Sequence, residues 1–142
     1  MEGGFGFQDV RVEGDRVVIM LRRSKTDQVG RGIRVVLYAL PGSEVCPVRT
    51  VGEFVCVRPI GLGAFFTHRD GTFLSKFQFV QVFRKCLCAA GYDGKRYASH
   101  SFRIGAATET ARCGLDEAAV RKIGRWESRR FRSYVRPHLL ND

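Results

Sequence analysis

The stretch DVRVEGDRVVIMLRRSKTDQVGRGIRVVLYAL, residues 9–40, decides the fold of the first part of the chain. It contains three runs rich in β-branched residues, at 9–12, 16–21 and 33–40, and such runs favour strands. The turn sequence EGD separates the first two runs, and the polar segment RRSKTDQVGRG separates the last two. The pattern predicts a three-stranded antiparallel meander. Lys25 then lies at the end of the second strand or in the hairpin turn just after it.

Beyond this sheet, proline, glycine and capping residues mark a series of predicted helices. Pro47 is typical of a first helical turn, and Pro59 ends the short helix that follows it. Ser75 is a candidate N-cap for a helix over about 76–90, which Gly91 terminates. That helix carries an apolar stripe, which predicts core packing. The stripe consists of Phe79, Val80, Phe83 and Leu87.

The C-terminal third of the chain is predicted to be helical in three pieces. Gly114 ends the first, and Asp116 is a candidate N-cap for the second, which stops at Gly124. The pieces cover about 101–113, 116–123 and 128–136. The whole pattern predicts a single α+β domain over residues 1–142, with a small three-stranded antiparallel sheet followed by a helical bundle.

Charge is the most biased property of the composition. The 142 residues include 24 Lys+Arg against 14 Asp+Glu, which gives a formal net charge of +10. Such an excess indicates a polyanionic partner, although a soluble basic surface is the simpler alternative and charge alone does not separate DNA from RNA or an anionic membrane. The sequence contains no apolar run of about 18 residues and no signal-like N-terminus. We therefore expect no membrane partner and an intracellular location, nuclear if the host is a eukaryote.

The cysteines predict neither disulfides nor a metal site. Their number is odd and their local sequence is apolar, which favours buried free thiols in a reducing compartment. They are Cys46, Cys56, Cys86, Cys88 and Cys113. No spacing of Cys and His typical of zinc emerges, so no metal or other cofactor is expected.

Two residues in the run SHSFRIGAAT can bind one phosphate together. His100 and Arg103 are three residues apart on a predicted helix, so their side chains lie on the same side, one turn apart. Arg103 offers a planar fork for two phosphate oxygens, and His100 can donate to the same phosphate or accept a proton. Taken alone, such a pair is far more often an ordinary surface feature.

The run RRFRSYVR contains a candidate nucleophile. Tyr134 lies between Arg132 and Arg136, whose positive charge favours the phenolate, the form in which a tyrosine attacks phosphorus. Trp126 has an indole N–H that donates without adding charge, and Lys25 can protonate a leaving oxygen. Each has an ordinary alternative: a packed tyrosine, a core tryptophan and a solvated turn lysine. Their conjunction is what favours chemistry. Further cations predict contacts with DNA phosphates, and they are Arg121, Lys122, Arg125, Arg129, Arg130 and Arg132.

In order, residue type and spacing, the segments SKTDQ, HSFRIGAAT, GRWES and YVR resemble the catalytic domain of tyrosine recombinases, the integrase family, most closely those of eukaryotic mobile elements. The resemblance covers about residues 9–136. It implies double-stranded DNA as the partner, a homo-oligomer on that DNA, and a 3′-phosphotyrosyl intermediate formed without metal or cofactor. It also implies a role for each candidate: Lys25 as general acid, His100 as base or phosphate donor, Arg103 as phosphate-binding arginine, Trp126 as neutral donor and Tyr134 as nucleophile.

The chain departs from the family pattern at its N-terminal side. The family has another active-site arginine on a helix before the sheet, and an N-terminal helical domain that closes around DNA. Arg11 and Arg16 lie in the predicted strands or their turn and do not fit that role. We therefore expect a fragment or a degenerate member with little strand exchange of its own. The alternative is a catalytically inactive basic DNA-binding module derived from a recombinase. An RNA-binding domain is a weaker option, because no RRM-like aromatic signature is present.

Overall fold

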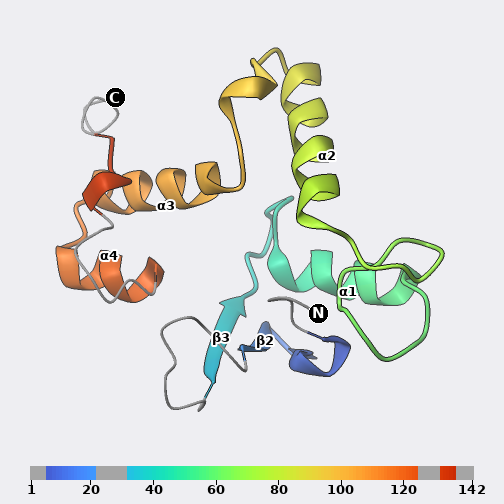
Figure 1. Cartoon of the computed structure of the whole chain (residues 1–142). Coiled ribbons are helices and arrows are strands. Elements are labelled where there is room, and N and C mark those ends of the chain that lie inside the picture. The colour runs from blue at the N-terminus through green and yellow to red at the C-terminus, as the bar shows by residue number, and fades with distance from the viewer. Residues whose placement is uncertain (1–5, 22–31, 125–131, 137–142) are drawn as a thin grey trace. The chain divides into compact units, whose positions relative to one another are not determined.

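The computed structural model of the chain describes residues 6–21, 32–124 and 132–136 (Figure 1). Within these residues, three strands are followed by four α-helices, so the predicted α+β class is confirmed. The chain divides into two compact units, Met1–Ser75 and Lys76–Asp142. The prediction of a single domain over residues 1–142 stays a prediction.

The first unit contains the predicted meander. Strands β1 (Val10–Glu13), β2 (Arg16–Leu21) and β3 (Ile33–Tyr38) form one antiparallel sheet in the order β1-β2-β3. Gly14 in the tight turn between β1 and β2 has φ of 60°, a conformation that a residue without Cβ adopts at little cost. The adjacent ends of β2 and β3 are paired. Their connection contains Lys25, which lies outside the described residues.

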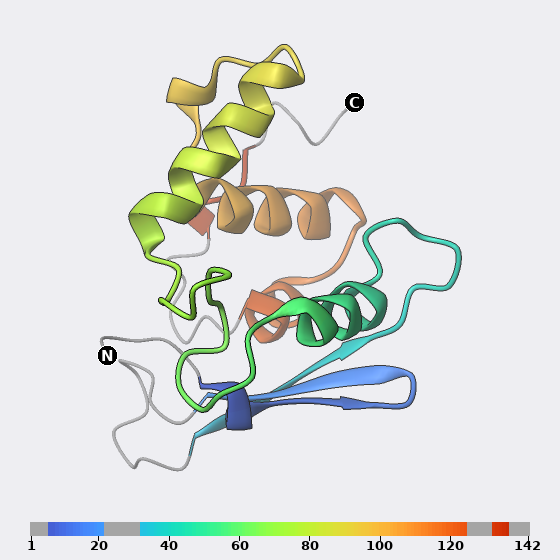
Figure 2. The same ribbon diagram turned by 90° about the vertical axis from the view of Figure 1, so that its right-hand side faces the viewer.

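Helix α1 (Pro47–Val57) lies along the sheet in this unit (Figure 2). Pro47 occupies its first turn, as predicted, and the chain leaves the helix at Arg58, whose extended conformation suits the residue before a proline. Val17 and Val18 of β2 and Phe65 are the largest fully buried side chains. The Phe54 ring of α1 packs edge-on against Phe65, with centroids 5.4 Å apart.

Arg58 joins the N-terminal turn to the loop after α1. Its guanidinium is buried over the ring of Phe7, 4.5 Å from the centroid, and donates to the Ala64 carbonyl at 3.2 Å. Phe7 begins a short 3₁₀ helix, η1 (Phe7–Asp9). A cation held against an aromatic face is stabilising when it is desolvated. Arg58 therefore has a structural role in the first unit.

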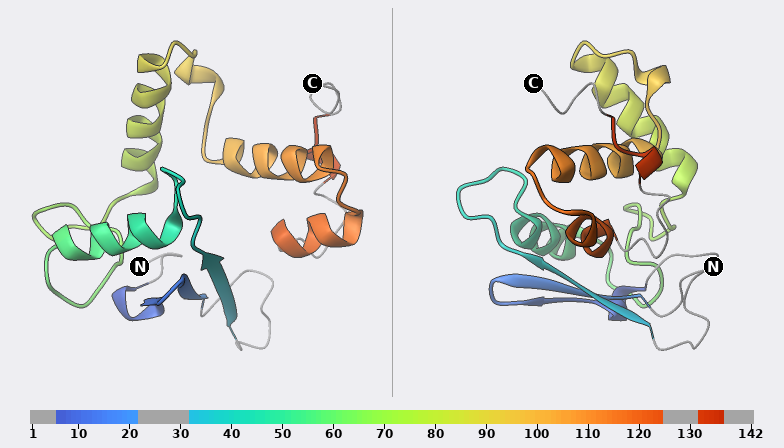
Figure 3. Two further views of the ribbon diagram at one scale, coloured as in Figure 1. Left: turned by 180° about the vertical axis from the view of Figure 1, so that it is seen from behind. Right: turned by 90° about the vertical axis from the view of Figure 1, so that its left-hand side faces the viewer.

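The second unit begins with helix α2 (Lys76–Ala89) and a 3₁₀ turn, η2 (Gly94–Arg96), and continues with helices α3 (His100–Arg112) and α4 (Glu117–Gly124) (Figure 3). Gly91 and Gly114 follow α2 and α3 with φ of 87° and 76°, as expected of helix-ending glycines. The Asp116 carboxylate accepts the Ala119 N–H at 2.8 Å and caps α4. The predicted boundaries of these three helices are confirmed to within a residue or two.

Aromatic rings of α2 contact a ring of α3, but the apolar stripe of α2 is less buried than the sequence predicted. The rings of Phe83 and Phe102 are 4.8 Å apart, and those of Phe79 and Phe102 are 6.0 Å apart. No residue of α2 is fully buried, and Phe79 remains 41% exposed. The prediction that the stripe forms core is therefore only partly right. The physical reason is that the stripe meets one large aromatic side chain of α3 instead of a complete apolar layer.

The prediction of buried thiols is right for one cysteine. Cys46 is buried and its sulfur accepts the Leu40 N–H at 3.3 Å. The other four are exposed. Three of them, Cys56, Cys86 and Cys88, lie in helices, where neighbours in the sequence point in different directions, so apolar neighbours do not imply a buried cysteine. In the ranges that the structure describes, no helix is long and apolar enough to cross a membrane. The same ranges hold no group of three or more His, Cys, Asp or Glu side chains placed to bind a metal ion.

Candidate active site

Helix α3 presents the predicted phosphate-binding pair at its N-terminal end. His100 is its first residue, and Arg103 follows one turn later. Because the helix is continuous, the two exposed side chains project from the same side. Ser99, at the N-cap position, makes no side-chain capping hydrogen bond. The first backbone N–H groups of a helix carry partial positive charge, so this end favours an anion.

Tyr134 lies beside this pair although it is distant in sequence. Its ring and the His100 imidazole are nearly parallel, with an interplanar angle of 18° and centroids 6.0 Å apart. The Tyr134 side chain is half-buried and that of His100 is exposed. The structure thus brings the candidate nucleophile, Tyr134, next to the candidate base, His100. His100 lies on the same helix as Arg103. Lys25 and Trp126 lie outside the described residues, so their place at the site stays a prediction.

A buried hydroxyl of α3 holds the backbone on either side of Val135, at the Tyr134 carbonyl and the Arg136 N–H. The side chain of Thr108 is almost fully buried. It donates to the Tyr134 carbonyl at 3.2 Å and accepts the Arg136 N–H at 3.1 Å. In Figures 1 and 3 the short segment 132–136 accordingly lies against α3.

The prediction of a helix over 128–136 is wrong for its described part. Arg132 and Ser133 form a 3₁₀ turn, Tyr134 lies in a turn, and the next two residues have no regular structure. Two physical causes act here. Thr108 satisfies the backbone groups that an α-helix would pair internally, and Arg136 precedes Pro137, which disfavours helical backbone at Arg136.

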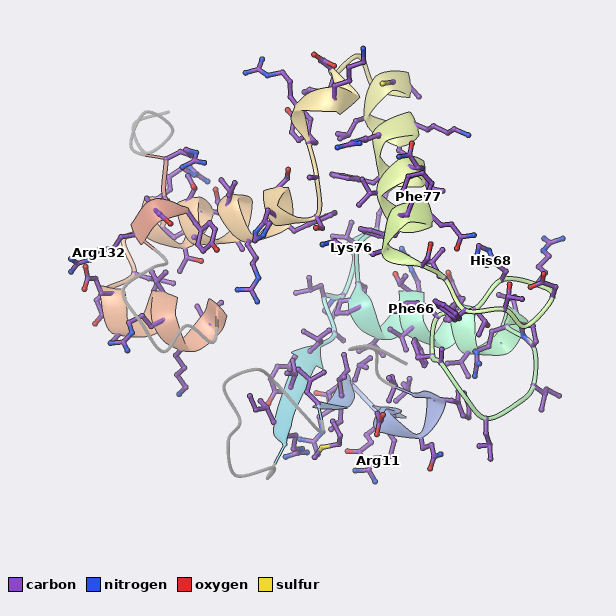
Figure 4. The ribbon with its side chains drawn as sticks, viewed as in Figure 1. Arg11, Phe66, His68, Lys76, Phe77 and Arg132 are labelled. Atoms are coloured by element: carbon purple, nitrogen blue, oxygen red, sulfur yellow. The ribbon has the colours of Figure 1, made fainter. Side chains whose placement is uncertain are left out.

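The two arginines that flank Tyr134 have local partners. The Arg132 side chain (Figure 4) contacts Glu117 Oε1 through Nε at 2.7 Å and through a terminal nitrogen at 2.5 Å. The Arg136 guanidinium donates to the Ser133 carbonyl at 2.8 Å. Arg132 therefore ties the Tyr134 segment to α4, and Arg136 stabilises the turn within the segment itself.

The proposed DNA-contacting cations are only partly within the described residues. On α4, Arg121 is half-buried and Lys122 is exposed. Arg132 is exposed but paired with Glu117. Arg125, Arg129 and Arg130 lie outside the described residues. A second exposed pair of the same kind links Arg112 and Glu109 near the end of α3. The hydrogen bonds from Arg112 hold the pKa of the Glu109 carboxyl below its usual range.

The chain is similar in sequence to a protein described as an integrase/recombinase. The chain is 27% identical over 131 residues to the "Integrase/recombinase xerD homolog" of Selenomonas ruminantium. This similarity supports the predicted resemblance of the chain to the tyrosine recombinase family. It covers 88% of the chain but only 38% of that relative, so the chain spans well under half of its length. No family model matches the chain, and no solved structure matches it. The closer likeness to eukaryotic mobile elements, the homo-oligomer and the nuclear location stay predictions.

Sequence reasoning missed Thr108 and Glu117. A weak signal for Thr108 was present, because it directly follows the small residues Gly105, Ala106 and Ala107 in a predicted helix. A threonine on the small-residue, buried side of a helix needs a hydrogen-bond partner. Glu117 gave no such signal, since its partner Arg132 is 15 residues away.

Proposed function

We propose that the chain is the catalytic part of a site-specific DNA recombinase that breaks and rejoins double-stranded DNA through a 3′-phosphotyrosyl intermediate. The observation that carries the proposal is the stacking of Tyr134 on His100, one helical turn from Arg103. The similarity to an integrase/recombinase over most of the chain supports it independently.

The reaction exchanges one phosphate ester for another. The Tyr134 phenolic oxygen, having lost its proton, attacks the scissile phosphorus and forms a tyrosyl ester with the 3′ end. The bond from phosphorus to the 5′-oxygen breaks, and that oxygen leaves as a hydroxyl after taking a proton. The reverse attack by a 5′-hydroxyl restores the DNA and frees the tyrosine. The ester energy is kept in the intermediate, so the cycle uses no cofactor.

Each nearby side chain has a role in this scheme. His100 accepts the phenolic proton or donates to the phosphate, since its ring lies against that of Tyr134. Arg103 binds two non-bridging oxygens and stabilises the charge that develops on them. We assign Trp126 as a neutral donor to the same phosphate and Lys25 as the acid that protonates the leaving 5′-oxygen. Removing one such donor typically costs about 10²–10³-fold in rate.

DNA binding is proposed to rest on phosphate contacts from α4 and the residues that follow it. If about four to six phosphates are neutralised, log K falls with log salt at a slope of roughly −4 to −5. Strand exchange joins two duplexes, so we propose that more than one copy of the protein acts on the DNA. Binding that is flat between low and physiological salt would contradict this part of the proposal.

The test is covalent capture on a nicked suicide duplex, from which the cleaved strand diffuses away. We expect a labelled adduct on a denaturing gel with the wild-type chain and none with Tyr134→Phe, which deletes the attacking oxygen. The matched control is Tyr92→Phe, because Tyr92 is also in the second unit, is 58% exposed and contacts only the ring of Tyr97 among aromatic groups in the described ranges.

The three outcomes are distinct. An adduct that Tyr134→Phe abolishes and Tyr92→Phe retains supports the recombinase. An adduct that persists in Tyr134→Phe overturns the nucleophile. Salt-dependent duplex binding with no adduct from the wild-type chain favours the alternative, a DNA-binding module without catalysis.

A further inference from the structure

We infer that Thr108 is a positioning residue that holds the Tyr134 ring against His100 by fixing the backbone on both sides of Val135. The inference rests on the proposed function for its catalytic consequence. Its structural part, the placement of the Tyr134 ring, rests on the two hydrogen bonds that the buried Thr108 hydroxyl makes.

The Thr108 hydroxyl satisfies two backbone groups with one oxygen atom. The Thr108 Oγ1–H donates to the Tyr134 carbonyl oxygen at 3.2 Å, and the same oxygen accepts the Arg136 N–H at 3.1 Å. A side-chain hydroxyl can donate once and accept at the same time, whereas an aliphatic side chain can do neither. The two bonds act on backbone groups two residues apart, so they fix both the place and the direction of the segment.

The location of Thr108 on α3 explains how it acts on the distant ring. Thr108 is eight residues after His100, a separation of about 12 Å along the helix axis and of about 80° around it. The backbone of Tyr134 is held at Thr108, and its ring reaches back along α3 to the imidazole. One helix therefore provides both the phosphate-binding pair and the anchor of the nucleophile.

The register of this anchor matters for the chemistry. A slip of one residue along the segment moves the Tyr134 side chain by about 3.3–3.6 Å. A misplacement of only about 1 Å in an active site can cost on the order of 10²-fold in rate. The exposed pair between Arg132 and Glu117 does not replace the anchor, because solvent and salt screen it.

Three substitutions separate positioning from general stability. Thr108→Val keeps the shape of the side chain and removes the hydroxyl. Thr108→Ser keeps the hydroxyl and removes the methyl group. The matched control is Thr110→Val, because the Thr110 hydroxyl donates to the Ala106 carbonyl at 2.6 Å within the same helix and makes no hydrogen bond with the described residues 132–136.

The first readouts do not depend on activity. In the full chain we expect Thr108→Val to speed hydrogen exchange of the Arg136 amide and to remove the nuclear Overhauser contact between the His100 and Tyr134 rings. Thr108→Ser and Thr110→Val should retain both. Unchanged exchange and an unchanged ring contact in Thr108→Val would overturn the inference.

The second readout is the rate of adduct formation on the suicide duplex. We expect a fall of roughly 10- to 100-fold for Thr108→Val, with the Kd for duplex DNA unchanged, and a change of less than about threefold for the other two variants. A normal rate in Thr108→Val, despite a lost ring contact, would show that Thr108 does not position the nucleophile. If the wild-type chain forms no adduct, the proposed function fails, and the exchange and ring-contact results alone decide whether Thr108 places the Tyr134 ring.

Discussion

Replacing Glu117 by glutamine should strengthen DNA binding at low salt. In the structure the Glu117 carboxylate holds the Arg132 guanidinium through two contacts, 2.7 and 2.5 Å long, to one oxygen. Arg132 is one of the cations that we propose to contact DNA, and an arginine held by a carboxylate is less available to a phosphate. Glu117→Gln removes the competing charge and nearly keeps the shape of the side chain.

The size of the effect follows from the exposure of the pair and from counterion release. The two side chains are 52% and 53% exposed, so losing the pair should cost at most about 1 kcal/mol of folding free energy. One additional phosphate contact steepens the slope of log K against log salt by about 0.9. Between 50 and 200 mM salt, the variant should therefore lose about three- to fourfold more affinity than the wild-type chain.

The assay is duplex binding by fluorescence anisotropy over a salt series. Glu109→Gln is the matched control, because Glu109 forms a similar exposed pair with Arg112, which is not among the proposed DNA contacts. It removes the same charge without releasing a proposed phosphate ligand. Equal slopes for Glu117→Gln and the wild-type chain would refute the reasoning, as would an equal change in Glu109→Gln.

Three further outcomes are expected. Lys25→Ala should slow adduct formation, and a substrate whose leaving 5′-oxygen is replaced by sulfur should restore the rate, because a thiolate leaves without a proton; no restoration would remove Lys25 from the role of general acid. Gly94→Ala should destabilise the chain by about 1–3 kcal/mol in urea unfolding, because a Cβ there would lie 2.8 Å from the Arg84 carbonyl oxygen and 2.9 Å from the Cys88 sulfur. Gly105→Ala in α3 is the control and should not destabilise, because among the described residues no atom beyond the surrounding helix backbone lies within 4 Å of the added Cβ. Since Arg112 lowers the pKa of Glu109, this pair stabilises the fold at neutral pH, and the stabilisation is lost as the pH falls through that lowered pKa. The difference in Tm between the wild-type chain and Glu109→Gln should therefore shrink on acidification. A constant difference in Tm would contradict this.

The sheet and most helix boundaries could be predicted from the sequence because local signals decide them. The β-branched runs gave the meander, and Pro47, Gly91, Gly114 and Asp116 marked helix ends through their own backbone preferences. The position of His100 and Arg103 one turn apart on the same helix followed from their spacing in the sequence. These features need no knowledge of contacts between distant residues.

The conformation of the Tyr134 segment could not be predicted in the same way. Its residues are compatible with a helix, and the competing hydrogen bonds come from Thr108, which is 26 residues away from Tyr134. The partner of Arg132 is similarly distant, on α4. The exposure of most cysteines was also missed, because an apolar local sequence does not show which way a helical side chain points.

The most direct test of the account is to identify the residue that carries the DNA. The adduct from the suicide duplex is digested with nuclease and protease, and the modified peptide is sequenced by mass spectrometry. The account predicts a nucleotide linked through its 3′-phosphate to the Tyr134 oxygen. A nucleotide on any other residue, or a peptide containing unmodified Tyr134 from a purified adduct, would contradict it.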